Sequence, residues 1–251
     1  MSQQRWAMGV EYDGTPFHGW QRQHNGNSVQ AELERALSRV AAHPLTVQCA
    51  GRTDAGVHAS GQVFHLDSSA PRTPRNWILG ANVNLPPEIA IQWAIPVAPH
   101  FHARFSALAR SYRYRILNRS HRAPIHHNRS VWIHHPLDVE RMARAAQSLL
   151  GTHDFSSYRA LGCQAKSPVR TIHYLTVERS GEEIILEIRA NAFLHHMVRN
   201  IAGVLIAIGK GERPTTWSGE LLQLRDRTLG GVTAPPQGLY LTAVEYPEEF
   251  F

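Results

Sequence analysis

The stretch TIHYLTVERSGEEIILEIR, residues 171–189, decides the fold class of this chain. Thr171–Val177 and Glu183–Arg189 have the residue content of strands, and Ser180–Gly181 between them is a turn sequence. Strands that are joined by so short a connection pair antiparallel. The sequence therefore predicts an antiparallel sheet in this part of the chain.

Helices are predicted on both sides of this strand pair. Before it in the sequence, Asp138 is suited to cap a helix that runs to Leu150, with Gly151 as its C-terminal stop. A strand at Tyr112–Leu117, a short helix near Thr216–Leu224 and a last strand at Gly238–Val244 complete this half. After the pair in the sequence, apolar residues at helical spacing predict a strongly amphipathic helix. These residues are Phe193, Met197, Ile201, Val204, Leu205 and Ile208.

The N-terminal part of the chain has a similar order of elements. Ser28–Ala41 is predicted to be a helix with one buried face, and a second helix is expected near Pro74–Val83. Trp6–Tyr12 is a predicted strand that ends at the turn-forming pair Asp13–Gly14. Further strands are expected at Thr46–Ala50, Gln62–Leu66 and Ile89–Pro96.

The repeated order of elements predicts an α+β fold built from two ferredoxin-like halves, which are also described as RRM-like. We expect antiparallel sheets, helices on one face of each sheet, and an active-site cleft between the halves. The halves would be residues 1–105, with the loop around Asp54, and residues 106–251. A chain of 251 residues that is 43% hydrophobic can bury the core that this requires.

Composition excludes several classes of protein. No apolar run approaches the roughly 20 residues that span a membrane, and the N-terminus lacks the layout of a signal peptide. Two cysteines, Cys49 and Cys163, are too few for a disulfide framework or a cysteine-rich zinc site. We therefore expect a cytoplasmic protein without a membrane segment.

The charge of the chain points to a polyanionic partner. The formal net charge is +6, and all but two of the 26 basic residues are arginine, whose planar fork suits phosphate groups and stacking on bases. Residues 89–137 contain no Asp or Glu. That acid-free stretch holds seven histidines and seven arginines, and we expect it to project a positive field. The alternative is a basic surface kept for solubility.

The loop GRTDAGVH, residues 51–58, is the most unusual stretch of the chain. Gly51 and Gly56 bracket Arg52 and Asp54 and permit backbone shapes that other residues resist. An aspartate in such a loop can be a nucleophile, a general base, a metal ligand or a turn former, and local chemistry alone favours the turn former. A metal site is disfavoured because the motif has no second carboxylate. The loop also matches neither phosphate-binding glycine pattern.

Six longer stretches, including this loop, carry a resemblance to a known family. They are EYDGTPFHGWQRQ (11–23), AGRTDAGVHASGQV (50–63), FHARFSA (101–107), YRY (112–114), NAFLHHMVRNIAG (191–203) and GLYL (238–241). The chain resembles the bacterial tRNA pseudouridine synthase A family nearly from end to end. The resemblance implies an enzyme that isomerises uridine to pseudouridine at positions 38, 39 and 40 of tRNA, as a homodimer and without a cofactor or metal.

The resemblance also implies roles for three residues. Asp54 matches the catalytic nucleophile, and Arg199 matches the arginine that pairs with it and keeps it ionised. Tyr112 matches the tyrosine that stacks on the target base and that can take part in removing the C5 proton. Read without the resemblance, Arg199 could be a solvated charge and Tyr112 a core aromatic of a strand whose tyrosines share one face.

Other matched positions imply contacts to RNA. Arg52 matches the residue used to flip the target base out of its stack, and Leu239 matches an apolar residue of the base pocket. The remaining matches are Arg72, Arg104, the loop residues Phe101, His102, Ala103 and Phe105, and the second loop Gly162, Cys163, Gln164, Ala165 and Lys166.

Alternatives remain open at this point. The chain could be an RNA-binding module without catalysis, a synthase for another RNA, or a hydrolase with an Asp nucleophile. A glycosidase would require paired carboxylates, and no partner for Asp54 is evident. The histidine pairs 126–127, 134–135 and 195–196 suggest a metal, but neighbours in a strand point opposite ways, so we expect none. We assign no role to residues 119–135.

Overall fold

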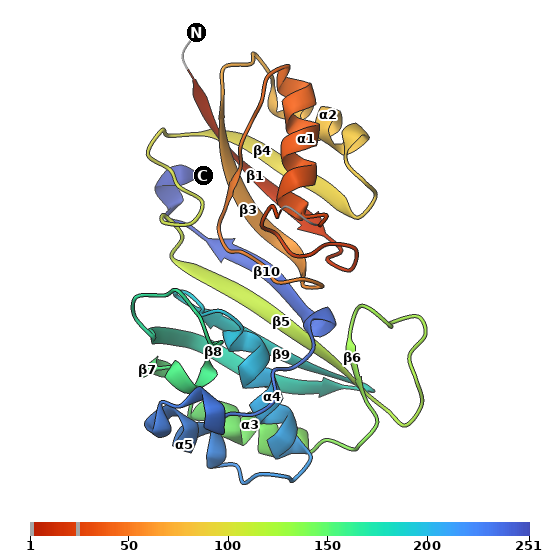
Figure 1. The fold of residues 1–251 in the computed structure, drawn as a ribbon, viewed down its shortest axis with the longest axis vertical. Coiled ribbons are helices and arrows are strands. Elements are labelled where there is room, and N and C mark those ends of the chain that lie inside the picture. The colour runs from red at the N-terminus through yellow and green to blue at the C-terminus, as the bar shows by residue number, and fades with distance from the viewer. Residues whose placement is uncertain (1–2, 24–25) are drawn as a thin grey trace. The chain divides into compact units, whose positions relative to one another are not determined.

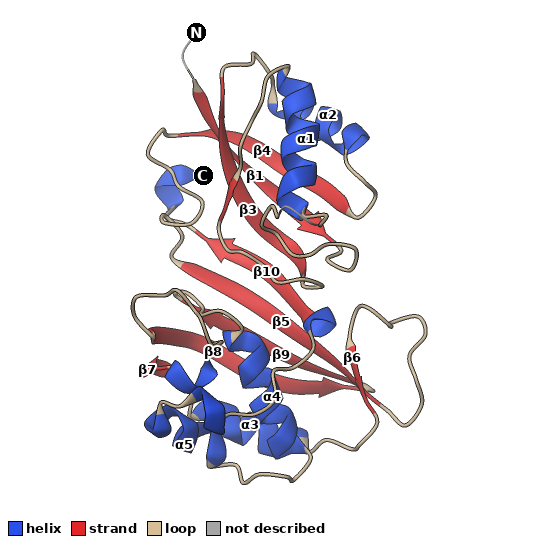
Figure 2. Ribbon diagram, viewed as in Figure 1, coloured by secondary structure: helices blue, strands red, loops and turns tan. Residues whose placement is uncertain are grey.

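The computed structural model describes residues 3–23 and 26–251, and this chain forms two compact units. The first unit comprises the chain up to Leu108 together with Tyr240–Phe251, and the second is Ala109–Leu239. Both units contain helices and strands, and most strand pairs are antiparallel (Figures 1 and 2). The α+β class predicted from the sequence is therefore confirmed.

The first unit is built around one central strand, β1, most of whose residues are buried. β1 pairs antiparallel with β3 on one side and with β4 on the other. β2 pairs antiparallel with β3, and β10 pairs with β3 in parallel. The strands of this unit are β1 (Gln4–Tyr12), β2 (Gln48–Cys49), β3 (His58–Ser68), β4 (Ile89–Val97) and β10 (Leu239–Glu245), the last without its first residue.

Two capped helices cover the same face of this sheet (Figure 1). α1 (Val29–Ala41) begins at Ser28, whose side chain accepts the backbone N–H of Ala31. α2 (Pro74–Asn84) begins with a complete capping box at Thr73 and Asn76. Leu33 and Leu37 of α1 and Trp77 of α2 are fully buried in the core. Local capping thus defines where each helix starts, and burial of its apolar face stabilises it.

The second unit is a further antiparallel sheet with three helices. β5 pairs antiparallel with β9, β9 with β8, and β8 with β7, whereas the short β6 joins β5 in parallel. The strands are β5 (Ala109–Asn118), β6 (Val131–Ile133), β7 (Gly151–Asp154), β8 (Val169–Ser180) and β9 (Glu183–Ala190). The helices are α3 (Val139–Gln147), α4 (Met197–Gly209) and α5 (Trp217–Leu224).

The structure corrects several predicted boundaries. α4 begins at Met197 rather than at Phe193, because His196 has a left-handed backbone (φ 60°) that cannot belong to the helix. α3 ends at Gln147, and Gly151, with φ 90°, opens β7 instead of stopping the helix. β6 and β7 were not predicted. The last strand, β10, pairs in parallel with β3, and from Tyr240 onward it belongs to the first unit.

In the described residues, none of the helices combines the length and the apolar character that crossing a membrane would require. Short 3-10 helices connect the larger elements. They are η1 (Ser156–Tyr158), η2 (Arg227–Leu229), η3 (Pro236–Gly238) and η4 (Glu248–Phe250).

Candidate active site

The loop that carries Asp54 is held rigidly within the first unit. The Thr53 hydroxyl hydrogen-bonds the Tyr12 hydroxyl at 2.8 Å, and the Gln62 side chain donates to the Gly51 carbonyl at 2.7 Å. Behind the loop, the backbone N–H of Trp20 donates to the Thr53 carbonyl at 3.0 Å. Asp54 is therefore half-buried on a backbone that is fixed by β1, β3 and the segment after β1.

Asp54 is also a turn residue, as local chemistry alone suggested. Its main-chain carbonyl accepts the N–H of Val57 at 3.1 Å, and Gly56 in this turn has φ 74°. A positive φ of this size is strained for most side chains and ordinary for glycine. The turn uses only the main chain of Asp54. Asp54 can therefore form the turn and also have a chemical role through its carboxylate.

The tyrosines and arginines of β5 alternate as predicted. Tyr114 is fully buried and donates its hydroxyl to the Pro235 carbonyl at 2.8 Å, and burial raises its pKa. Tyr112 is half-buried, with its ring edge-on to Phe193 at 5.0 Å between centroids. Tyr114 is thus a core residue, whereas Tyr112 keeps an accessible part.

Some of the arginines in the acid-free stretch are neutralised by a neighbouring strand. Arg113 forms an ion pair with Glu187 at 2.5 Å, and Arg115 forms one with Glu183. Arg119 forms an ion pair of 2.9 Å with Glu182. The absence of acids from residues 89–137 therefore overstates the positive field, because β9 and the turn before it bring glutamates to the same place.

Arg199 is tethered rather than solvated. It lies in the first turn of α4, and its Nε donates to the Ala234 carbonyl at 2.8 Å. The N–H of Ala234 in turn donates to the carbonyl of Arg199 at 3.1 Å. Gly203 follows one turn later, and a Cβ there would lie 1.8 Å from the Val232 carbonyl. The space beside Gly203 is occupied by the main chain of Val232 and Ala234.

The loop after β4 divides into anchors and exposed groups. Phe101 and Ala103 are fully buried, so their side chains hold the loop in place and cannot reach RNA. The Phe101 carbonyl accepts Arg5 Nη1 at 2.8 Å, and the Ala103 carbonyl accepts the Tyr246 hydroxyl at 2.7 Å. Phe105, in contrast, is 75% exposed. The RNA-contact prediction for this loop thus narrows to the residues that reach its surface.

A column of rings supports the exposed part of this loop. The ring centroids of His65 and His102 are 4.6 Å apart, those of His102 and Phe105 are 4.3 Å apart, and the Arg104 guanidinium lies 5.5 Å from the Phe105 centroid. His65 Nδ1 accepts the N–H of Ala103 at 3.2 Å, and His102 Nδ1 accepts that of Arg104 at 3.1 Å. Both imidazoles thus act as acceptors. His65 was not among the predicted site residues, and its position in a strand pattern offered no signal.

The remaining predicted contacts are spread over both units. Arg52 is exposed, whereas Arg72 is half-buried and donates from Nε to the Val40 carbonyl at 2.8 Å. In the second unit, Gly162 opens an exposed loop with φ 81° that runs to Lys166. Leu239 is buried.

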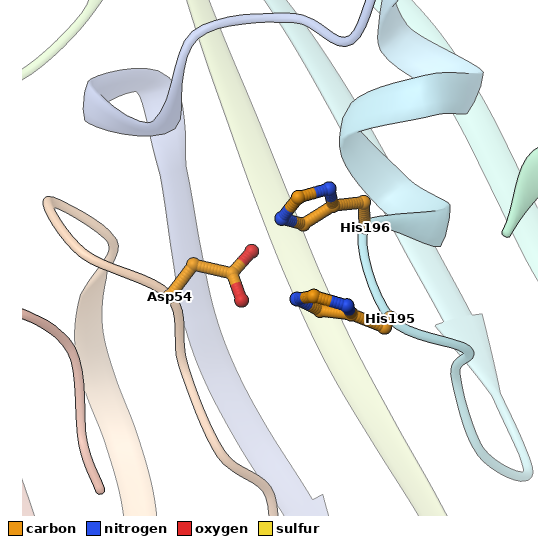
Figure 3. A group of neighbouring side chains, drawn as sticks. All are labelled: Asp54, His195 and His196. Carbon is orange, nitrogen blue, oxygen red and sulfur yellow. The ribbon is translucent and has the colours of Figure 1, made fainter. Parts of the chain in front are cut away.

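The histidine pairs do not lie in strands. His195 and His196 form a turn directly before α4, and Figure 3 draws them together with Asp54, which belongs to the first unit. The ring centroids are 4.0 Å apart in this pair and also in the pair His134–His135. The expectation that neighbouring rings point opposite ways was therefore wrong for both pairs.

Comparison with known proteins places the chain in one family. A family model described as tRNA pseudouridine synthase matches residues 8–106 and 145–247. A curated protein of Methylococcus capsulatus named tRNA pseudouridine synthase A is 59% identical over 98% of this chain and 91% of its own length. Proteins of the same name from Nitrosococcus oceani and Pseudomonas aeruginosa are 60% and 59% identical, over 98% of this chain and over 95% and 87% of their own lengths. Identity this high along almost the whole chain shows that it belongs to the tRNA pseudouridine synthase family, a family of isomerases.

Proposed function

We propose that this enzyme isomerises uridine to pseudouridine in the anticodon stem-loop of tRNA, at positions 38, 39 and 40, with Asp54 as its nucleophile. The observation that carries the proposal is the near-complete match to relatives named tRNA pseudouridine synthase A. The resemblance of the Asp54 loop to the family's catalytic motif supports the assignment of the nucleophile.

The reaction exchanges one bond for another within the substrate. The bond between ribose C1′ and N1 of uracil breaks, the base turns, and C1′ bonds to C5, which loses its proton while N1 gains one. A carboxylate can carry the substrate covalently between these two steps. No electrons enter or leave, so the chemistry that the chain must supply is a nucleophile and proton transfer.

We assign supporting roles to two residues of the second unit. Arg199 would pair with the Asp54 carboxylate and keep it ionised, because an opposite charge favours the charged form. Its Nε bond to Ala234 restricts how the guanidinium plane can turn, which suits a directional pair with a carboxylate. Tyr112 would stack on the target base and assist in removing the C5 proton.

The RNA itself would be held mostly by charge and shape. Arg52 would brace the gap left by the flipped base, and exposed groups near Arg104, Phe105 and the loop 162–166 would contact the backbone. Leu239 would line the base pocket. Arg72 and His102 would support these contacts from behind, since they are only partly exposed.

We further propose a ferredoxin-like arrangement in each half, a homodimer, and a cytoplasmic location. In the first unit, the order β1-α1-β2-β3-α2-β4, with β1 between β3 and β4, supports this arrangement. The functional division into residues 1–105, with the Asp54 loop, and residues 106–251, with Tyr112 and Arg199, is part of the same proposal.

The Asp54→Asn variant tests the proposal. We expect it to bind tRNA within about twofold of wild type and to lose isomerisation by at least about a thousandfold, because a neutral amide is a poor nucleophile. The assay is tritium release from tRNA labelled at uridine C5. Asp138→Asn is the matched control, since asparagine caps the start of α3 as well as aspartate does.

Two results would contradict parts of the proposal. Near-wild-type tritium release by Asp54→Asn would show that the nucleophile is misassigned. Tight tRNA binding by the wild type without any tritium release from uridines at positions 38, 39 and 40 would favour a binding module or a synthase for another RNA.

A further inference from the structure

A short segment of the second unit lies across the start of α4. We call residues 231–235 the strap. Its Ala234 makes two main-chain hydrogen bonds to Arg199, one to the side-chain Nε and one to the backbone carbonyl. The orientation of Arg199 therefore depends on where the strap lies.

A polar network around the buried side chain of Asn200 fixes the middle of the strap. Thr233 donates its hydroxyl to Asn200 Oδ1 at 2.7 Å, and Arg227 Nη2 donates to the same oxygen at 3.1 Å and to the Thr233 hydroxyl at 3.0 Å. Asn200 is 2% exposed and donates its Nδ2 to the Tyr158 carbonyl at 2.8 Å. Each polar atom in this triangle is satisfied, which makes the arrangement directional and costly to break.

Contacts at Pro235 and Val232 limit the strap on either side of this network. The Tyr114 hydroxyl donates to the Pro235 carbonyl, and the Val232 carbonyl fills the space beside Gly203. The strap is thus held at consecutive residues, while the side chain of Val232 is 86% exposed.

We propose that Asn200, Thr233 and Arg227 are positioning residues that set the guanidinium of Arg199 through the strap. They act on the reaction only through Arg199, and the inference rests on the proposed pairing of Arg199 with the nucleophile. Displacing a catalytic group by about 1 Å can cost on the order of a hundredfold in rate. A loosened strap therefore lowers the rate of isomerisation without changing how tightly tRNA binds.

The Thr233→Val variant is the central test, because valine keeps the shape of threonine and removes the hydroxyl. We expect kcat for tritium release to fall about tenfold while KM for tRNA changes by less than about twofold. A less well placed Arg199 pairs less well with the Asp54 carboxylate, so the acidic limb of the kcat–pH profile should move to higher pH. A merely structural role would not move that limb.

Matched variants complete the design. Val232→Thr changes a neighbouring strap residue whose side chain is exposed, and it should leave kcat and the acidic limb unchanged. Thr233→Ser restores a hydroxyl and should recover most of the rate. Arg227→Lys keeps the charge but loses the planar fork, and it should show the same limb shift as Thr233→Val. Arg227→Lys also serves if Thr233→Val does not fold.

The outcomes separate this inference from the proposed function. If Thr233→Val and Arg227→Lys lower the melting temperature alone, with kcat and the acidic limb as in wild type, the positioning role is refuted. If Thr233→Ser does not restore the rate, the Thr233 hydroxyl does not position Arg199. If Arg199→Lys itself leaves kcat and the acidic limb unchanged, the proposed ion pair fails, whatever the strap variants do.

Discussion

His65 is a buried imidazole whose surroundings keep it neutral. Its side chain lies in β3 with the residue 3% exposed, and its Nδ1 accepts the N–H of Ala103. Burial lowers the pKa of His65 to about 4, and the nearby charges of His102 and Arg5 act in the same direction, whereas Asp67 opposes them. Burial also lowers the pKa of His102. Protonation of His65 would remove the acceptor that anchors the loop 101–105.

This residue predicts how stability depends on pH. The pKa of His65 is lower in the folded state than in the unfolded one, so the unfolded state binds more protons between pH of about 6.5 and 4. The free energy of unfolding should therefore fall as the pH falls through that window. His65→Asn keeps an acceptor near the Nδ1 position and cannot titrate. Urea unfolding at pH 7 and pH 4.5 should show a loss that is smaller in this variant, by on the order of 1–2 kcal/mol after solvent screening.

The control for this prediction is His121→Asn, which removes an exposed histidine. Its loss of stability on acidification should equal that of the wild type. An equal loss in His65→Asn would show that His65 does not cause the pH dependence.

At the scale of the element, α4 contains a glycine in its interior because the strap packs directly against the helix at that position. Glycine in a helix interior costs about 1 kcal/mol relative to alanine. Gly203 nevertheless stands in the middle of α4, because the Val232 carbonyl of the strap occupies the position that a Cβ would take. Helix propensity is here outweighed by a close main-chain approach.

Gly203→Ala should consequently lower stability, although alanine is the better helix former. We expect a net loss of about 1–3 kcal/mol from the clash, measured by urea unfolding, together with a fall in kcat, because the strap must move. Ala207→Gly makes the opposite exchange in the same helix and should cost about 1 kcal/mol without affecting kcat. A Gly203→Ala variant that is more stable than wild type would show that the strap can move away from α4 at little cost in free energy.

At the scale of the whole molecule, the net charge of +6 predicts a salt-dependent affinity for RNA. The arginines should contribute unequally. Arg113 forms an ion pair with Glu187 in the sheet, whereas Arg104 lies beside Phe105 and is one of the residues that we propose contact the RNA backbone. Formal charge alone would treat the two as equal.

A matched pair of variants tests this difference. Arg104→Gln should reduce the slope of log affinity for tRNA against log salt concentration by about one, because one phosphate contact is lost. Arg113→Gln removes the same charge and should leave the slope nearly unchanged. The slope is measured by fluorescence titration of labelled tRNA from low to moderate salt. Equal slopes in the two variants would show that Arg104 and Arg113 contribute equally. A wild-type affinity that does not change with salt concentration would refute the electrostatic model altogether.

The elements that the sequence predicted well are those with strong local signals. α1 and α2 begin where Ser28 and Thr73 cap them, and β8 and β9 meet at the predicted turn. β6 and β7 are not predicted from the sequence, because they are short and are defined by their pairing with β5 and β8. The start of α4 was predicted too early, since apolar spacing does not reveal that His196 has a left-handed backbone.

The sequence by itself determined the α+β class, the family and most of the order of elements, and it supplied the predicted residues of the candidate site. Local periodicity, caps and long motifs lie within short stretches of chain, so the letters alone carry them. Only the tertiary structure decided that Arg199 is tied to Ala234, 35 residues further along, that glutamates of β9 pair with Arg113 and Arg115 of β5, and that the side chain of Phe101 is buried. These features arise from groups that are distant in the chain and meet only when the core closes, and no local pattern encodes such a meeting.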